Sequence, residues 1–398
     1  MRNKTLGGTL IIAGTSIGAG MLTLPLVLSS VGFLTGVCLM ILIWGLAAYS
    51  GLLIAEACCA CPQAKTLHNM AGMLLGRQGQ TVAVGAMLFL FYALCAAYIS
   101  GGAAQLQDVL AKWNIFLSSR QAACSVTLMI GFVLWVGTAM VDYANRLLFM
   151  LMLLFLLLIL MALLPEIKLD YLLTVNSHPS LWLAALPILY TSFGYQGSVP
   201  SVVSYLNREP YYFRKALIFG SAIPLAVYLL WQLAVSGVLP PVVMTSTGSV
   251  GGMIDSLGYL SASVWMEGAV NSFAILALVT SFLGVSLGLF DYLAEVCQRK
   301  NGGLGRFQSV CMTLLPPLVI AVFSPDSFIT ALGYAAIALV ILAIYLPAAM
   351  VWKVRKQKKH QNYRVAGGLL AIVISISLGS LIVVAQLGVV TGYLSSVG

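Results

Sequence analysis

Long apolar stretches separated by short polar segments run along the whole chain. A helix needs about 18 to 20 apolar residues to cross a lipid bilayer, and eleven stretches approach or exceed that length. The pattern therefore predicts an all-α integral membrane protein with about eleven transmembrane helices. Their expected limits are residues 6–29, 32–57, 81–106, 121–140, 146–164, 182–206, 216–238, 267–293, 307–324, 327–351 and 366–388.

Glycine and hydroxyl residues interrupt the first of these stretches near its middle. Glycine weakens a helix and exposes its backbone. Within hydrocarbon, the freed N–H and C=O groups must be satisfied by protein, water or a bound solute. We therefore expect a helix break that holds a solute, formed by Gly14, Thr15, Ser16, Ile17, Gly18, Ala19 and Gly20.

The sixth stretch has a similar interruption, Thr191-Ser192-Phe193-Gly194-Tyr195-Gln196-Gly197-Ser198-Val199-Pro200-Ser201. Interrupted helices at corresponding positions of two halves are typical of the binding site of a secondary transporter. The alternative is that the glycines allow close helix packing, since Gly14 and Gly18 have the four-residue spacing of small residues that is typical of such packing.

Ten of the stretches divide into two sets of five, and an odd number of spans inverts the second set relative to the first. We expect broken helices 1 and 6 in a five-plus-five inverted-repeat fold. Residues 1–164 would form the first repeat and residues 165–351 the second. Residues 352–398 would add a cytoplasmic basic loop and an eleventh helix.

The charge pattern predicts the orientation. Only 8% of the 398 residues are charged and 61% are hydrophobic, which excludes an ordinary soluble domain. With the N-terminus in the cytoplasm, 17 of the 20 Lys and Arg residues fall in cytoplasmic segments, the exceptions being Lys112, Arg120 and Lys168. This asymmetry follows the positive-inside rule. It predicts a cytoplasmic N-terminus and a periplasmic C-terminus, and it explains the net charge of +9 without a nucleic-acid partner.

The two breaks suit a small zwitterion. The N-terminal end of a half-helix attracts a carboxylate, and the C-terminal end of another attracts an ammonium group. An α-amino acid carries both charges. Phe91 and Tyr98 of the third span would pack on an aromatic ring of the substrate. Beside residues 14–20, we expect binding by Tyr98, Phe193, Gly194, Tyr195, Gln196, Gly197 and Ser198.

Three further residues are candidates for ion coupling or gating. Thr280 and Ser281 in the eighth span would complete an oxygen-lined ion site, or they would bond to their own helix. Asp291, near the cytoplasmic end of that span, would pair with an inner basic residue as a gate. The sequence contains no catalytic triad, P-loop or zinc motif, so we expect neither an enzyme nor an ATP-driven pump, and no cofactor or metal.

Several blocks in matching order resemble the bacterial hydroxy/aromatic amino acid permeases, and within them the tyrosine-specific branch. The resemblance implies a multi-pass importer of the inner membrane with the fold of the amino acid–polyamine–cation superfamily. It also implies proton-coupled uptake of an aromatic amino acid at spans one and six, with Tyr98 and Ser281 nearby. The blocks are residues 3–7, 13–21, 96–101, 191–201 and 280–292.

One segment departs from the pattern of that family, whose members often have a lysine inside span five. Here Asn145-Arg146-Leu147-Leu148-Phe149 continues into Met150 without a lysine. Coupling would then use Asp291, another acid, or a cation at Thr280 and Ser281. The leading hypothesis is a proton-coupled importer of tyrosine. The alternatives are a permease of the same fold for tryptophan, serine or threonine, a sodium-coupled version, and, from other classes, a channel or a membrane enzyme.

Overall fold

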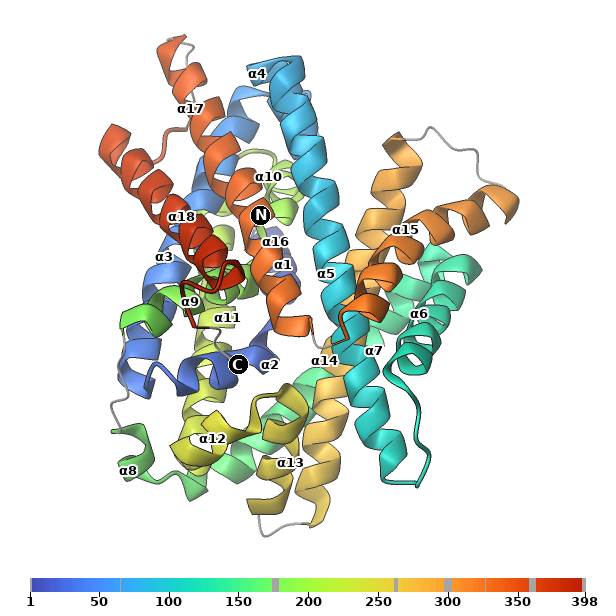
Figure 1. The fold of residues 1–398 in the computed structure, drawn as a ribbon. Coiled ribbons are helices and arrows are strands. Elements are labelled where there is room, and N and C mark those ends of the chain that lie inside the picture. Colours follow the sequence, from blue (N-terminus) through green and yellow to red (C-terminus); the bar gives the residue numbers. More distant parts are fainter. Residues whose placement is uncertain are drawn as a thin grey trace.

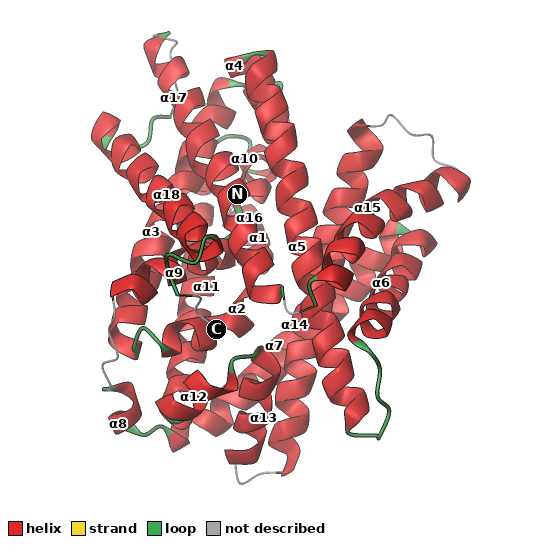
Figure 2. Ribbon diagram, in the orientation of Figure 1, coloured by secondary structure: helices red, strands yellow, loops and turns green. Residues whose placement is uncertain are grey.

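The computed structural model describes residues 2–64, 66–173, 179–260, 264–296, 303–325, 327–357 and 363–395. Across these residues all regular secondary structure is helical (Figure 2). The prediction of an all-α protein is thereby confirmed.

The first half of the described chain contains helices α1 to α8. Their bounds are α1 Arg2–Ser16, α2 Gly20–Ser29, α3 Phe33–Ala60, α4 Leu67–Leu75, α5 Arg77–Ala111, α6 Ser119–Val136, α7 Thr138–Leu163 and α8 Leu169–Leu172, with a 3-10 turn at Leu164–Glu166.

The second half contains helices α9 to α18. Their bounds are α9 Pro179–Ser192, α10 Val199–Tyr205, α11 Pro210–Val238, α12 Pro241–Thr247, α13 Val250–Leu260, α14 Val264–Val296, α15 Gly303–Phe323, α16 Phe328–Val340, α17 Leu346–Lys356 and α18 Gly368–Val390. A 3-10 turn, η2, covers Gln196–Ser198, and a π-helical turn, η3, joins α16 to α17 at Ile341–Tyr345.

The helix pattern matches the expected spans closely. Nine single helices in the described ranges are long and apolar enough to cross a membrane, and α1 with α2 forms a tenth candidate, bent by 57°. The expected sixth span corresponds to α9 and α10, which are separated by η2 and are each shorter than a full crossing. The count of eleven crossings therefore stays a prediction.

Large apolar side chains cover the outer face of α7. Met150, Leu154, Leu157 and Met161 are 67%, 50%, 55% and 66% exposed. Their spacing of four, three and four residues places them on one side of the helix. Apolar surface of this extent belongs in hydrocarbon rather than water, so these residues face lipid.

The two ends of the helix bundle contain different segments (Figure 1). Helix α4 and the basic end of α17 lie at one end, while α8, α12 and α13 lie at the other. The first end comprises segments expected in the cytoplasm. Orientation in the membrane remains a prediction, and five of the basic residues that support it lie outside the described ranges: Lys65, Arg299, Lys300, Lys358 and Lys359.

A buried ion pair links the basic end of α17 to α3. The Arg355 guanidinium donates two hydrogen bonds of 2.7 Å to the Glu56 carboxylate, whose side chain is fully buried. The Val365 N–H donates to the same carboxylate at 2.8 Å. Helix α17 and the segment leading into α18 are thus both tied to α3.

The helices on either side of the two breaks pack against other helices. Helix α1 packs along α11, α2 contacts α9, and α16 packs against both α5 and α9. On another side, α14 packs against α5 and α7. Each break is therefore flanked by helices that contact the rest of the bundle, while α1 keeps Leu6 and Leu10 exposed on one face.

Candidate substrate-binding site

The first break is short. Helix α1 ends at Ser16 and α2 begins at Gly20, so only three residues separate them. The Ala19 N–H donates a hydrogen bond of 2.8 Å to Ser281 Oγ on α14. A Cβ atom at Gly18 would collide with that same oxygen. Glycine at position 18 therefore allows α14 to approach the backbone of the break.

The second break is longer and contains its own turn. Helix α9 ends at Ser192, and η2 leads into α10, whose first turn accommodates Pro200. The Tyr195 hydroxyl donates to the Ala47 carbonyl at 3.0 Å, and Gln196 Nε2 donates to Ser50 Oγ at 3.2 Å. Both acceptors belong to α3, so this break is fixed by side chains that reach a neighbouring helix.

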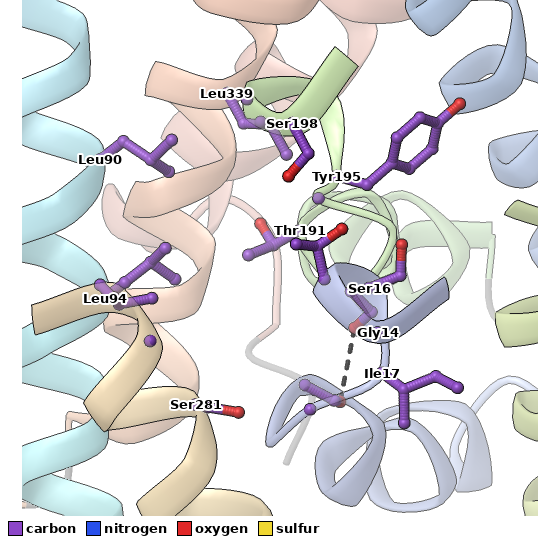
Figure 3. A pocket seen from close by; sticks show the side chains of 18 of the residues that line it. Gly14, Ser16, Ile17, Leu90, Leu94, Thr191, Tyr195, Ser198, Ser281 and Leu339 are labelled. Carbon is purple, nitrogen blue, oxygen red and sulfur yellow. Dashed lines mark hydrogen bonds between the residues drawn. The ribbon is translucent and has the colours of Figure 1, made fainter. Parts of the chain in front are cut away.

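A cavity of about 420 Å³ lies between the two breaks. Figure 3 shows Ser16 and Ile17 of the first break, Thr191, Tyr195 and Ser198 of the second, and Leu90 and Leu94 across from them. Most of the residues expected from sequence line it. They are Gly14, Thr15, Ser16, Ile17, Gly18, Gly20, Tyr98, Gly194, Tyr195, Gln196, Gly197, Ser198, Thr280 and Ser281.

Three expected residues do not line the cavity. Ala19 is fully buried, with its N–H directed to Ser281. Phe193 is also fully buried and packs on the ring of Tyr228, with 5.2 Å between the ring centroids. Asp291 lies on the exposed surface of α14 and forms no ion pair with a basic residue in the described ranges.

One wall of the cavity is apolar, and sequence reasoning missed most of it. Its residues lie on helices α5, α7, α14 and α16, which are apolar over most of their length. The sequence therefore contained no signal that separated these positions from lipid-facing ones. They are Met87, Leu90, Leu94, Phe149, Val285, Leu332 and Leu339, which join Phe91.

Among the residues that the structure describes, none that lines the cavity carries a formal charge. The polar part of the wall consists of backbone groups, hydroxyls and two side-chain amides. Asn145 Oδ1 and Gln196 Oε1 are buried acceptors without a hydrogen-bond partner in the described part of the chain. Leaving such an acceptor unpaired costs about 1–3 kcal/mol, so both atoms favour a ligand that donates hydrogen bonds.

The hydroxyls of Thr280 and Ser281 are already engaged. Thr280 Oγ1 donates to the Leu276 carbonyl of its own helix at 2.7 Å and lies 4.0 Å from the thioether sulfur of Met152. Ser281 Oγ accepts the Ala19 N–H. Thr280 therefore bonds within its own helix, as one of the two interpretations expected.

A tyrosine of α11 that sequence reasoning missed links the two breaks. The hydroxyl oxygen of Tyr228 lies 2.6 Å from the Ser16 carbonyl oxygen and 2.8 Å from the Ser192 carbonyl oxygen. These carbonyls belong to the last residues of α1 and α9. Tyr228 is one of 17 tyrosines, and nothing in its sequence neighbourhood marks it.

Comparison with known proteins finds relatives along almost the whole chain. The sequence matches the tryptophan/tyrosine permease family over residues 1–386. Tyrosine-specific transport systems 1 and 2 of Haemophilus influenzae are 36% and 37% identical to it, covering 98% and 99% of the chain and 98% of each relative. A tryptophan-specific transport protein of Pseudomonas aeruginosa is 34% identical, covering 95% of the chain and 93% of the relative.

Proposed function

The chain belongs to the tryptophan/tyrosine permease family, and from that premise we propose that it imports tyrosine across the bacterial inner membrane by proton-coupled symport. The observation that carries the proposal is the cavity between the two helix breaks, which has an apolar wall and no formal charge on its described lining residues. Its volume of about 420 Å³ lies within the range of roughly 300–1,000 Å³ that small-molecule sites occupy.

The backbone of the substrate would be held by the breaks. The N-terminal end of α2 would present the amides of Gly18 and Gly20, which line the cavity, and the positive end of a helix dipole to the carboxylate. The C-terminal end of α1 and the unpaired Gln196 Oε1 present acceptors to the ammonium group. Helix dipoles and amide groups would replace charged side chains in this recognition.

The ring of the substrate would lie against the apolar wall. Leu90, Phe91 and Leu94 form one continuous face of α5, and Leu339 approaches from α16. Asn145 Oδ1 would accept the phenolic O–H of tyrosine. The indole N–H of tryptophan offers a similar donor, which keeps tryptophan as the alternative substrate. Serine and threonine would leave this apolar wall uncovered.

The two hydroxyls of α14 favour proton coupling over sodium coupling, because both already form hydrogen bonds to protein groups. Thr280 and Ser281 are bonded to protein groups. The Met152 sulfur, which lies 4.0 Å from Thr280 Oγ1, is a poor ligand for a hard cation. No carboxylate of the described residues lines the cavity, so an acid that carries the proton would act from outside the wall. Asp291 at the end of α14 stays our candidate for this gating role.

The same proposal includes alternating access through two inverted repeats, residues 1–164 and 165–351, with a cytoplasmic N-terminus and a periplasmic C-terminus. Its supports are the placement of one break in each set of spans and the basic residues gathered beside α17. Single cysteines introduced at positions 74 and 243 would test the orientation. A membrane-impermeant thiol reagent would label each cysteine only when added on the side of the membrane where that position lies.

The deciding experiment is uptake of radiolabelled tyrosine into proteoliposomes under an imposed inward proton gradient, without sodium. Concentrative, saturable uptake that collapses with a protonophore is expected. Excess unlabelled tryptophan, serine and threonine as competitors would rank the alternative substrates. Uptake that requires sodium would support the sodium-coupled version, and no tyrosine movement under either gradient would overturn the proposal.

A further inference from the structure

Tyr228 stands where the ends of two broken helices converge. It is fully buried, and its ring packs on Phe193 of the second break. Its hydroxyl lies within hydrogen-bond distance of the terminal carbonyls of α1 and α9, at Ser16 and Ser192. A residue of α11 thus reaches both breaks with one polar atom.

This convergence poses an electrostatic problem. The C-terminal end of a helix carries a partial negative charge of about half an elementary charge. Two such ends that face one point repel each other unless a donor or a cation lies between them. In transporters with broken helices, half-helix C-terminal ends and unwound carbonyls commonly coordinate a cation. In this structure the group between the two carbonyls is the neutral hydroxyl of Tyr228.

We propose that Tyr228 is a positioning residue whose hydroxyl takes the place of a coordinated cation, holding the ends of α1 and α9 together. This inference rests on the proposed transport function, because the two ends that it joins form the cavity. Ser16 and Ser192 both line that cavity. A shift of one half-helix relative to the other would therefore move the groups that hold the substrate.

The contact between the breaks is close enough to transmit such a shift. Ser192 Oγ donates to the Ile188 carbonyl at 2.9 Å and lies 3.4 Å from the Gly20 carbonyl. A Cβ atom at Gly20 would lie 3.1 Å from Ser192 Oγ. The end of α9 therefore rests directly on the start of α2, and Tyr228 closes this junction from the side of α11.

Tyr228→Phe tests the inference, because it removes the hydroxyl and keeps the ring against Phe193. In sodium-free proteoliposomes we expect kcat/KM for tyrosine to fall at least tenfold, mainly through a higher KM. Sodium or lithium should then restore uptake at least threefold in a saturable manner, while wild-type uptake should not respond. A purely structural role for the hydroxyl would produce a loss without this cation response.

Tyr345→Phe is the matched control. It also removes one tyrosine hydroxyl, that of the half-buried Tyr345, which hydrogen-bonds with Ser380 Oγ at 2.9 Å outside the cavity. Its uptake should stay within twofold of wild type, without a response to sodium. If neither wild type nor this control takes up tyrosine, the proposed function fails and not the role of Tyr228.

A second measurement does not depend on transport. Melting temperature is compared in sodium chloride and in choline chloride, and only Tyr228→Phe should be stabilised by sodium. If that variant does not fold, para-aminophenylalanine at position 228 keeps an N–H donor at the same place and should retain uptake within threefold of wild type. Three results would each overturn the inference. They are a wild-type KM in Tyr228→Phe, a loss of uptake in Tyr228→Phe that sodium does not reverse, and a loss of uptake in the variant with para-aminophenylalanine at position 228.

Discussion

The two helix breaks both line the cavity, but different kinds of contact hold each of them in place. The first has three residues, and its backbone is in direct contact with Ser281 of α14 and Ser192 of α9. The second contains a 3-10 turn, and its side chains Tyr195 and Gln196 reach α3. One break is held by close approach of small residues and the other by long polar side chains.

This difference predicts different sensitivities. A break held by close approach is disturbed by added volume, because the neighbouring backbone cannot retreat without moving a helix. A break held by side chains is disturbed by the loss of a hydrogen bond. Gly18 and Gly197 illustrate the contrast, since a Cβ atom would meet Ser281 at the first position and nothing within 4 Å at the second.

The largest expected effect is that of Gly18→Leu. The new side chain would overlap Ser281 Oγ and force α14 away from the break. We expect tyrosine uptake to fall by about a hundredfold or more, corresponding to about 2.7 kcal/mol, with a lower melting temperature. Insertion into the membrane should persist, as measured by yield and gel filtration in detergent.

A double variant tests whether a clash with Ser281 causes the loss of uptake. In Gly18→Ala the new Cβ atom would collide with Ser281 Oγ but would lie 3.6 Å from Ser281 Cβ. Adding Ser281→Ala should therefore restore part of the uptake that Gly18→Ala loses. Uptake that is equally low in the single and double variants would contradict the steric explanation.

Gly197→Leu should also abolish uptake, but by another route. The side chain would extend into open space at the cavity rather than into a neighbouring helix. Binding of tyrosine should be lost while the melting temperature stays near that of wild type, which separates this variant from Gly18→Leu. Gly197→Ala should change uptake less than threefold. Normal uptake in both leucine variants would exclude the site between the breaks.

Tyr195→Phe should have a smaller effect. It removes the hydrogen bond to the Ala47 carbonyl, worth about 1 kcal/mol, so KM should rise about fivefold. Gly51 provides a cross-check, because a Cβ atom at this position would lie 2.6 Å from the Tyr195 hydroxyl. Gly51→Ala should therefore impair uptake more by itself than in combination with Tyr195→Phe. A larger loss in the double variant would argue against the role of the Tyr195 hydroxyl in fixing the second break.

Thr280→Val should have the smallest effect. Its hydroxyl bonds to the Leu276 carbonyl of its own helix, so uptake should change less than twofold and should stay independent of sodium. Initial rates in sodium-containing and sodium-free buffer provide the measurement. A loss of sodium-stimulated uptake in this variant would instead identify Thr280 as an ion ligand.

The sequence predicted the helices and the breaks because both depend on local composition. Residues 6–29 are apolar enough to form a span, and the glycines and hydroxyls in their middle weaken the helix there. The structure places the break at Ile17 to Ala19, inside the predicted segment. Fourteen of the seventeen expected residues line the cavity, since most of them come from these two local interruptions.

The remaining features depend on packing between distant segments. Tyr228 lies 212 residues from Ser16 along the chain, yet its hydroxyl contacts that carbonyl. Leu90, Leu94 and Leu339 differ from lipid-facing leucines only in the direction they point. Phe193 lies within the second break, but its ring is directed to Tyr228. None of these facts follows from the residues that are adjacent in sequence.

The absence of formal charge from the cavity wall determines how the transporter would experience the membrane voltage. A tyrosine substrate would enter as a zwitterion with no net charge, and the described residues of the wall add none. Only the coupling proton would then move charge through the field, which contributes about 2.3 kcal/mol per elementary charge at 100 mV. Over a complete transport cycle, each tyrosine would thus be accompanied by one positive charge per coupled proton.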